Sequence, residues 1–248
     1  MRYLVDLHTH TVASDHAYSS INEYVQQADK IGIAMFATTD HGPDLEDAPH
    51  FWHFANLKVI PHVIDGIGVL RGIEANIRAD GSLDLEKHYL QRLDIVLAGF
   101  HPCLEPQDEA TNTAILKKVI TNGQVDILTH IGNPTYPINF REVMECALEH
   151  NVAIELNGSS SVSSRKGSHD NCVQVAKLAR ELGNTIALGS DAHFSGYLGN
   201  FKEVERIIEE AKLSYEQIIN ISPVTVLEFL EKRGHSPIAS LHELFKVF

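Results

Sequence analysis

Short apolar runs alternate with longer segments of helical periodicity along most of the chain. The apolar runs have the length of strands, and most contain few polar positions, as expected of strands that are buried on both faces. We therefore predict seven strands, in residues 3–10, 34–41, 68–77, 94–101, 126–132, 152–160 and 185–193.

The segments between these strands carry the start and stop signals of helices. Residues 19–32 begin with serine, a favoured helix cap, and end at Gly32; residues 110–123 and 168–183 also end on glycine. Further helices are predicted within residues 139–151 and 200–213, with shorter helical pieces near 215–220 and 224–233. Residues 44–65 contain two prolines and are expected to be irregular, and residues 77–85 to form a turn or small hairpin.

Seven strands that alternate with helices indicate a parallel sheet built from β–α–β crossovers. No glycine-rich phosphate loop follows the first strand, which disfavours a doubly wound nucleotide-binding sheet. We expect an α/β fold, a closed or nearly closed (β/α) barrel with seven strands rather than eight. Neither a composition shift nor a long linker marks a second domain, so residues 1–248 are expected to form a single domain.

Charge and cysteine content narrow the function classes. The 20 basic and 33 acidic residues give a formal net charge of −13, which argues against a protein that binds nucleic acid through a basic face. A site that meets phosphate through metal ions remains open. The three cysteines form no C-x-x-C pair, and neither a signal peptide nor an apolar run of about 20 residues is present, so we expect a cytoplasmic protein without a membrane span. A homo-oligomer that uses the exposed faces of the outer helices stays open.

The chain contains 15 histidines, and many of them fall at the predicted strand ends. In barrels of this kind the carboxyl ends of the strands face the functional mouth. Six strands thus deliver histidine or a carboxylate to one place. The nine candidate metal ligands are His8, His10, His16, His41, Glu74, His101, His130, Asp191 and His193.

The spacing of these residues suits metal binding. His8 and His10 are two positions apart on one strand, so their side chains project together, and Asp191 and His193 repeat the arrangement. Zinc takes about four ligands, and nine exceed the needs of one ion. We therefore expect two or three ions, with Glu74 as a bridging carboxylate; manganese and iron also suit nitrogen and oxygen ligands.

The motifs DLHTHT, TTDHG, GIEANI, GFH, LTHIGNP and LGSDAH, in this order, resemble the PHP family of polymerase and histidinol phosphatase domains. The resemblance covers about residues 3 to 230, and DHGPDLEDAPHFWHF and SSRKGSHDN have counterparts in the stand-alone bacterial branch described as probable zinc-dependent phosphatases. The family resemblance implies a distorted seven-stranded, TIM-like barrel with a trinuclear metal cluster, usually zinc, at its mouth. All nine positions of the family's ligand pattern are filled.

When the family's ligand pattern is transferred to the matching residues of this chain, the resemblance implies three ions, with Glu74 as the bridging ligand. The three ligand sets are His8, His10, Glu74 and Asp191; His16, His41 and His193; and Glu74, His101 and His130. Asp6 and Asp40 lie next to ligands in the sequence, where they either orient imidazole N–H groups or make ordinary hydrogen bonds at strand ends.

The primary hypothesis is a metal-dependent phosphoesterase. Metal-activated water can attack phosphorus while two ions hold the attacking and leaving oxygens. The favoured substrate is a phosphate monoester of a small molecule, with Glu74 and Asp191 assigned to catalysis. Arg165 and Lys166, just past the sixth strand, are the candidate phosphate-binding residues, because guanidinium grips phosphate bidentately and ammonium adds a point charge.

Three other functions remain open at this point. The first is a phosphodiesterase or 3′–5′ exonuclease acting on nucleic-acid ends, against which the acidic charge weighs. The second is an amide or deaminating hydrolase. The absence of an obvious bridging lysine at the fourth strand end weighs against it. The third is a non-catalytic metal-binding module, which would want closed coordination spheres rather than an open barrel mouth.

Overall fold

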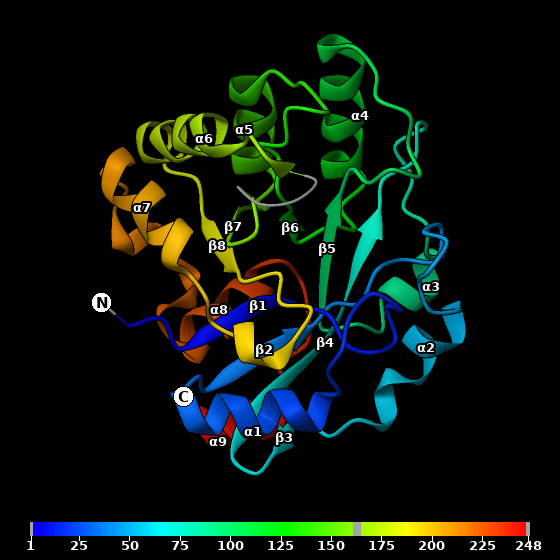
Figure 1. Cartoon of the computed structure of the whole chain (residues 1–248), viewed down its shortest axis with the longest axis vertical. Helices are drawn as coiled ribbons and strands as arrows, with labels where there is room; N and C mark the ends of the chain where they lie inside the picture. Colours follow the sequence, from blue (N-terminus) through cyan, green and yellow to red (C-terminus); the bar gives the residue numbers. More distant parts are fainter. Residues whose placement is uncertain (1, 161–164, 247–248) are drawn as a thin grey trace.

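Seven parallel strands follow one another around the molecule in chain order in the computed structural model, which describes residues 2–160 and 165–246 (Figure 1). The order is β1-β2-β4-β5-β6-β7-β8, and the short β3 pairs antiparallel with β4. The strands are β1 (Val5–Thr9), β2 (Met35–Thr38), β3 (Val63–Ile64), β4 (Ile67–Asn76), β5 (Ile95–Gly99), β6 (Ile127–Leu128), β7 (Ala153–Asn157) and β8 (Ile186–Gly189). The fold is a distorted seven-stranded α/β barrel of the TIM type.

The first and last strands close the barrel through few direct bonds. At their carboxyl ends the Asp191 amide donates to the His8 carbonyl, and the His10 amide donates to the Ala192 carbonyl, each at 2.9 Å. Nearer their amino ends the buried Asn220 side chain fills the gap. Its amide nitrogen donates to the carbonyl groups of Val5 and Leu188, and its oxygen accepts from the Leu188 amide at 2.7 Å. The seam between β1 and β8 thus depends on a side chain as well as on backbone pairing.

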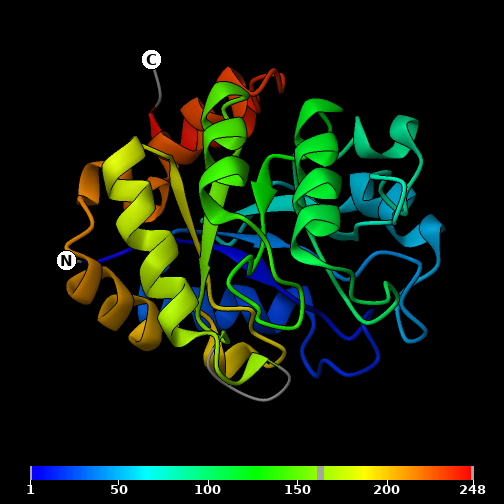
Figure 2. The same ribbon diagram turned by 90° about the horizontal axis from the view of Figure 1, so that it is seen from above.

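Helices cover the outside of the strands. Figures 1 and 2 show α4, α5, α6 and α7 side by side along the part of the barrel formed by β5 to β8, and α1 packs against β2 and β4. The bounds of these helices are α1 (Ile21–Ile31), α4 (Glu109–Thr121), α5 (Phe140–Glu149), α6 (His169–Leu182) and α7 (Lys202–Ala211). The predicted signals act as expected for α1: Ser20 and Glu23 form a capping box, and Gly32 ends the helix in a left-handed conformation.

The inside of the barrel is divided along its axis into an apolar and a polar half. Early in the strands, Val5, Leu70 and Ile95 pack with side chains of α8 (Pro223–Lys232) and α9 (Ala239–Phe245), which cover that end. Further along, the inward positions carry Glu74 on β4 and Glu155 on β7. The apolar half supplies the core, and the polar half lies where a site is expected.

A β-bulge in β1 decides which way its histidines face. Asp6 pairs with Phe36 and Thr9 with Thr38, so three steps on β1 match two on β2. Leu7 belongs to the interior core, and the extra residue allows His8 to turn toward the interior as well.

The seven predicted strands are confirmed. Six are shorter than their apolar runs, and β4 is as long as its run but begins and ends one residue earlier. Of the turn or small hairpin expected in residues 77–85, the structure shows a small hairpin, with Ile77 bridged to Leu83. Residues 44–65, expected to be irregular, contain α2 (Phe51–Asn56), the 3-10 turn η1 (Leu57–Val59) and β3. The short α3 (Lys87–Leu90), η3 (Ser195–Tyr197) and the last helix α9 were not predicted, and the piece near 215–220 consists of two 3-10 turns, η4 (Tyr215–Gln217) and η5 (Ile219–Ile221). Among the described residues, no helix has the length and apolar character needed to cross a membrane.

Candidate metal centre

All nine candidate ligands lie together at the carboxyl ends of the strands. His8 and Glu74 belong to β1 and β4 themselves, while His41 and His101 follow the ends of β2 and β5. His16 comes from the loop after β1, and the other members, His10, His130, Asp191 and His193, stand just beyond their strands. The prediction that six strands bring these side chains to one place is therefore confirmed. Metal binding by these side chains is a proposal.

Glu74 is the centre of the cluster. Its carboxylate is buried, and five imidazole rings place a nitrogen within 3.5 Å of its oxygens. The shortest contact is 2.7 Å, from His130 Nε2, and His41 Nδ1 and His101 Nε2 lie at 2.9 and 3.1 Å. A carboxylate with this many nitrogen neighbours has the position needed of a bridging ligand.

Ring nitrogens also approach one another directly. His8 Nε2 lies 3.1 Å from His10 Nε2, and His16 Nε2 lies 2.9 Å from His193 Nε2. Two ligand nitrogens on one tetrahedral zinc ion would be roughly 3.3 Å apart, given zinc–nitrogen distances of about 2.0–2.1 Å. In addition, His41 Nδ1 is buried 2.9 Å from a Glu74 oxygen without the geometry of a hydrogen bond. A cation bound between the two atoms of each close pair would satisfy them, so the donor set fits metal ions.

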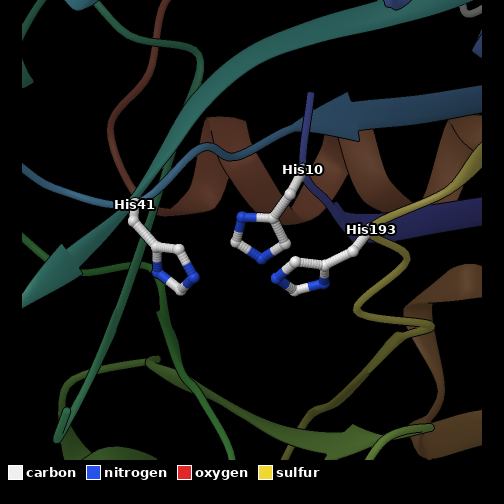
Figure 3. Close-up of side chains that lie close together, drawn as sticks. All are labelled: His10, His41 and His193. Atoms are coloured by element: carbon white, nitrogen blue, oxygen red, sulfur yellow. The ribbon is translucent and has the colours of Figure 1, made fainter. Parts of the chain in front are cut away.

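Three compact groups of potential ligand atoms stand out among the described residues. Figure 3 shows one of them, His10, His41 and His193, whose rings point toward a common centre. The others are His8, His10 and Asp191, and His41, Glu74 and His101. The family pattern assigns His10 and His193 to different ions, whereas here these two residues belong to one group. Each of His10 and His41 also takes part in a second group. The cluster is thus continuous, with no separation into isolated sites.

The charges in the cluster suit cation binding. Burial alone would raise the pKa of Glu74, yet the neighbouring His8, His101 and His41 hold the pKa of that carboxyl well below its usual range. Burial likewise opposes ionisation of Asp191, but Arg165 and His8 keep its pKa well below the usual range. Both carboxylates are therefore ionised at neutral pH.

The imidazoles divide into two kinds. Burial, reinforced by the charge of His41, lowers the pKa of His10 to about 3, and burial together with Arg165 lowers the pKa of His130 to about 4. These rings are neutral at pH 7, as metal ligands must be. Burial also disfavours charge on His8, but Glu74 and other carboxylates outweigh it and raise the pKa of His8 well above its ordinary value. A metal ion at His8 would take the place of that proton.

The cluster opens to solvent on one side. The His16 and His193 side chains are 45% and 29% exposed, whereas the side chains of Glu74 and Asp191 are almost fully buried. Arg165 reaches the cluster and pairs with the buried Asp191 Oδ2, so the structure brings this predicted phosphate-binding residue to the site. Lys166 is exposed. Residues 161–164 of the same loop lie outside the described part of the chain.

Asp6 does not orient an imidazole. It accepts the backbone amides of Ser190 and Gly199 at 3.0 and 2.8 Å, and thereby positions the loop that carries Asp191. Of the two alternatives left open for this residue, ordinary strand-end hydrogen bonding is correct. Burial raises its pKa above the usual value.

Asp40 also holds backbone and hydroxyl groups. It accepts from the Thr11 amide and hydroxyl and from the Ser14 hydroxyl, and so fixes the loop that leads to His16. Its Oδ2 lies 3.3 Å from His53 Nε2, a ring outside the nine candidates.

Other residues make the contacts that were expected of these two aspartates. Glu155 Oε1 lies 2.6 Å from His8 Nδ1, and Asp47 pairs with His16 Nδ1. Glu155 could have been found from the sequence, because a carboxylate interrupts the apolar run AIELN two positions before Asn157. Asp47 lies in an irregular loop, where the sequence gives no comparable signal.

Two of the candidate ligands have an uncommon backbone. The φ angles of His130 and Asp191 are +35° and +56°, in the left-handed region that side chains other than glycine rarely adopt. Such conformations cost free energy and concentrate at functional sites.

A cavity of about 430 Å³ lies at the other end of the strands, away from this cluster. Its lining includes Asp94 and Asp126, which precede β5 and β6, and His235 from the C-terminal segment. Because ligands of barrel folds bind at the carboxyl ends of the strands, the histidine cluster is the better candidate for chemistry.

The PHP domain model matches residues 6–243 of this chain. The chain belongs to the PHP family. The resemblance seen in the motifs is thereby confirmed. Among relatives, this PHP chain is similar to the "Probable phosphatase" of Shewanella pealeana, with 53% identity over 240 residues that cover 96% of each chain. It is also similar to the "Probable phosphatase YcdX" of Escherichia coli O127:H6, with 51% identity over 98% of this chain and 100% of the relative.

Solved structures of other proteins share the fold. Histidinol phosphate phosphatase from Lactococcus lactis, solved with zinc, L-histidinol and phosphate, superposes with a TM-score of 0.59 and 15% identity, covering 86% of this chain and 95% of that one. A chain of archaeal ribonuclease P with mature tRNA gives a TM-score of 0.58 and 14% identity, covering 92% of this chain and 90% of that one. At these identities the likeness establishes a common barrel.

Proposed function

We propose that this protein is a metal-dependent phosphatase that hydrolyses phosphate monoesters of small molecules. One observation carries the proposal: nine ligand-type side chains from the ends of six strands, the buried Glu74 among them, converge at the barrel mouth and leave the His16 side open. Membership of the PHP family and relatives above 50% identity that are named probable phosphatases support the reaction class.

The nine side chains would hold three ions, zinc in the first place, with Glu74 shared between ions. Bound ions would supply a water nucleophile of lowered pKa and a positive field for the phosphoryl oxygens. Manganese and iron remain compatible with the same nitrogen and oxygen donors. The zinc in the Lactococcus lactis relative is consistent with this choice.

The chain's own groups give the site its polarity. Glu74 and Asp191 remain ionised because imidazole and guanidinium groups surround them. The Nε atom of Arg165 is buried without a hydrogen-bond partner in the described structure, so this side chain keeps donor capacity beyond its pair with Asp191. We assign that capacity to a substrate phosphate, with exposed Lys166 as a weaker second contact.

The main alternative is a phosphodiesterase or 3′–5′ exonuclease. Binding along a polynucleotide requires several lysine or arginine contacts, whereas this chain has a net charge of −13. A non-catalytic metal-binding module would keep its ligands closed to solvent, and the 45% exposure of His16 argues against that arrangement. The protein's three free cysteines agree with a cytoplasmic location, which is part of the proposal.

Metal analysis and a substrate comparison test this function together. Elemental analysis of protein purified without chelator should give more than one transition-metal ion per chain, and three are expected. The kcat/KM should be higher for an aryl phosphate and for sugar or amino-alcohol phosphates than for a phosphodiester or a single-stranded oligonucleotide at the same salt concentration. Preferred processing of the oligonucleotide would replace the monoesterase by the exonuclease, and bound metal without turnover would favour the binding module.

A further inference from the structure

Glu155 is a buried carboxylate behind the candidate metal centre. Its side chain is 1% exposed, and its Oε1 lies 2.6 Å from Nδ1 of His8. The opposite nitrogen of the same ring, Nε2, lies 3.2 Å from Glu74 Oε2 and 3.1 Å from His10 Nε2. The carboxylate thus sits on the one side of His8 that faces away from the cluster.

The other oxygen of Glu155 reaches two more parts of the site. Oε2 accepts the backbone amide of His130 at 2.9 Å, at the residue whose φ is +35°. It also accepts from Asn157 Nδ2 at 3.1 Å, and that amide nitrogen lies 3.2 Å from Asp191 Oδ2. One carboxylate therefore links candidate ligands that come from three separate parts of the barrel.

The neighbouring strand leaves room for this contact. A Cβ atom at Gly189 would overlap both Glu155 Oε1 and the Cβ atom of His8. Gly189 has a negative φ, so the backbone conformation itself would accept a side chain. The absence of a side chain at this position therefore permits the close approach of Glu155 to His8.

We propose that Glu155 is a positioning residue for the metal centre. By accepting the Nδ1 proton of His8, it selects the tautomer whose Nε2 is free to bind metal, and it fixes His130 and, through Asn157, Asp191. The proposal rests on the proposed metal binding. It predicts that loss of Glu155 weakens chiefly the ion held by His8, His10 and Asp191 and leaves the ion on the His193 side in place.

The test compares zinc affinities of folded variants. Glu155→Gln keeps the shape of the side chain but removes the charge, Glu155→Asp keeps the charge at a shorter reach, and Glu149→Gln changes an exposed glutamate as a matched control. Zinc is titrated into metal-free protein against a chromophoric chelator. We expect Glu155→Gln to bind one zinc equivalent about 10–100-fold more weakly and Glu155→Asp to recover part of that loss. Glu149→Gln should match the wild type.

Unchanged affinity of every zinc equivalent in a folded Glu155→Gln protein would overturn the proposal. So would an equal weakening of all equivalents, because that is the pattern of a general structural defect. If this variant does not fold, ¹⁵N NMR of histidine rings in the zinc-loaded wild type decides the matter: His8 with its proton on Nε2 would contradict the inference. Zinc binding is measured without turnover, so a wild type that binds zinc but lacks phosphatase activity would refute the proposed function and leave this inference standing.

Discussion

The Nε2 atoms of His16 and His193 lie 2.9 Å apart, although 177 positions separate the two residues in the chain. His16 is held from behind by Asp47, and His193 Nδ1 lies 3.0 Å from the Asp191 carbonyl oxygen, so both rings turn the same nitrogen toward one point. These two side chains are also the more exposed members of the cluster. A cation between them would be the one most accessible from solvent.

Removal of either ring should therefore cost the same ion. We expect His16→Ala and His193→Ala each to lose one metal equivalent per chain, and the double variant to lose no more than the single ones. The kcat/KM for an aryl phosphate should fall about 100-fold or more in all three. Elemental analysis after dialysis against a weak chelator measures the first effect, with the exposed His88→Ala as control. Loss of two equivalents in the double variant would show that the rings serve different ions.

Substitution of Glu74 should lower metal content and turnover more than substitution of any other single residue. Because five imidazole nitrogens lie within 3.5 Å of its oxygens, Glu74→Gln removes the negative charge that several ions would share. We expect the loss of more than one metal equivalent and a fall in kcat of at least about 100-fold, with near-UV circular dichroism unchanged. Glu149→Gln serves as the matched control. Turnover close to that of the wild type would rule out a bridging role for Glu74.

Arg165 allows a separation of substrate binding from metal binding. If its guanidinium contacts the substrate phosphate, Arg165→Ala should lower kcat/KM about 10–100-fold while the metal content stays at the wild-type value. Lys166→Ala, at an exposed position, should have a smaller effect. Metal loss in Arg165→Ala would instead indicate that its main role is to hold Asp191.

The order of strands and the place of the site could be predicted from local pattern. Apolar runs identify buried strands, and parallel strands in chain order must end on one face, so residues such as His41 and His101 could be assigned to a common mouth. The bulge in β1 could not be predicted from the sequence, because strict alternation along a strand would place His8 on the face opposite Leu7. That both point inward depends on the pairing with β2, which local sequence does not encode.

Contacts between segments that are distant in the chain account for the other differences between the predicted and the observed site. Asp6 stands two positions from His8, yet it binds backbone amides near residue 190, while the carboxylate behind His8 comes from residue 155. Spacing along one strand reveals which residues share a face, but it cannot reveal which side chain of another strand comes to lie behind them. For the same reason Asn220, in a 3-10 turn, gave no sign of its role in closing the barrel.

Asn220 should contribute strongly to stability. Asn220→Ala would leave the Val5 carbonyl and both backbone groups of Leu188 without these partners in a fully buried place. Each buried unsatisfied group costs about 1–3 kcal/mol, so we expect the free energy of unfolding to fall by about 3 kcal/mol or more. Chemical denaturation measures it. The exposed Asn22→Ala in α1 should change stability by less than about 0.5 kcal/mol. Equal effects of the two variants would show that the seam between β1 and β8 does not depend on Asn220.

His235 should make stability depend on pH at the end of the barrel away from the metal centre. Its Nε2 lies 3.0 Å from both carboxylate oxygens of Asp126, a residue that also pairs with Arg233. Burial disfavours the charged ring and Arg233 repels it, but the hydrogen bond and charge of Asp126, with a contribution from Asp94, raise the pKa of His235 above its ordinary value.

A raised pKa in the folded state means that the folded protein binds the proton more tightly than the unfolded chain does. The stabilisation is fully present below the unfolded pKa of about 6.5 and is lost as pH rises through the folded pKa. Wild-type protein should therefore exceed His235→Gln in the free energy of unfolding by a larger margin at pH 6 than at pH 9. Urea denaturation of metal-loaded protein at both pH values measures the margin, and comparison at equal pH cancels titrations at the metal centre. A margin that stays constant, or grows with pH, would show that the His235–Asp126 pair gains nothing from protonation.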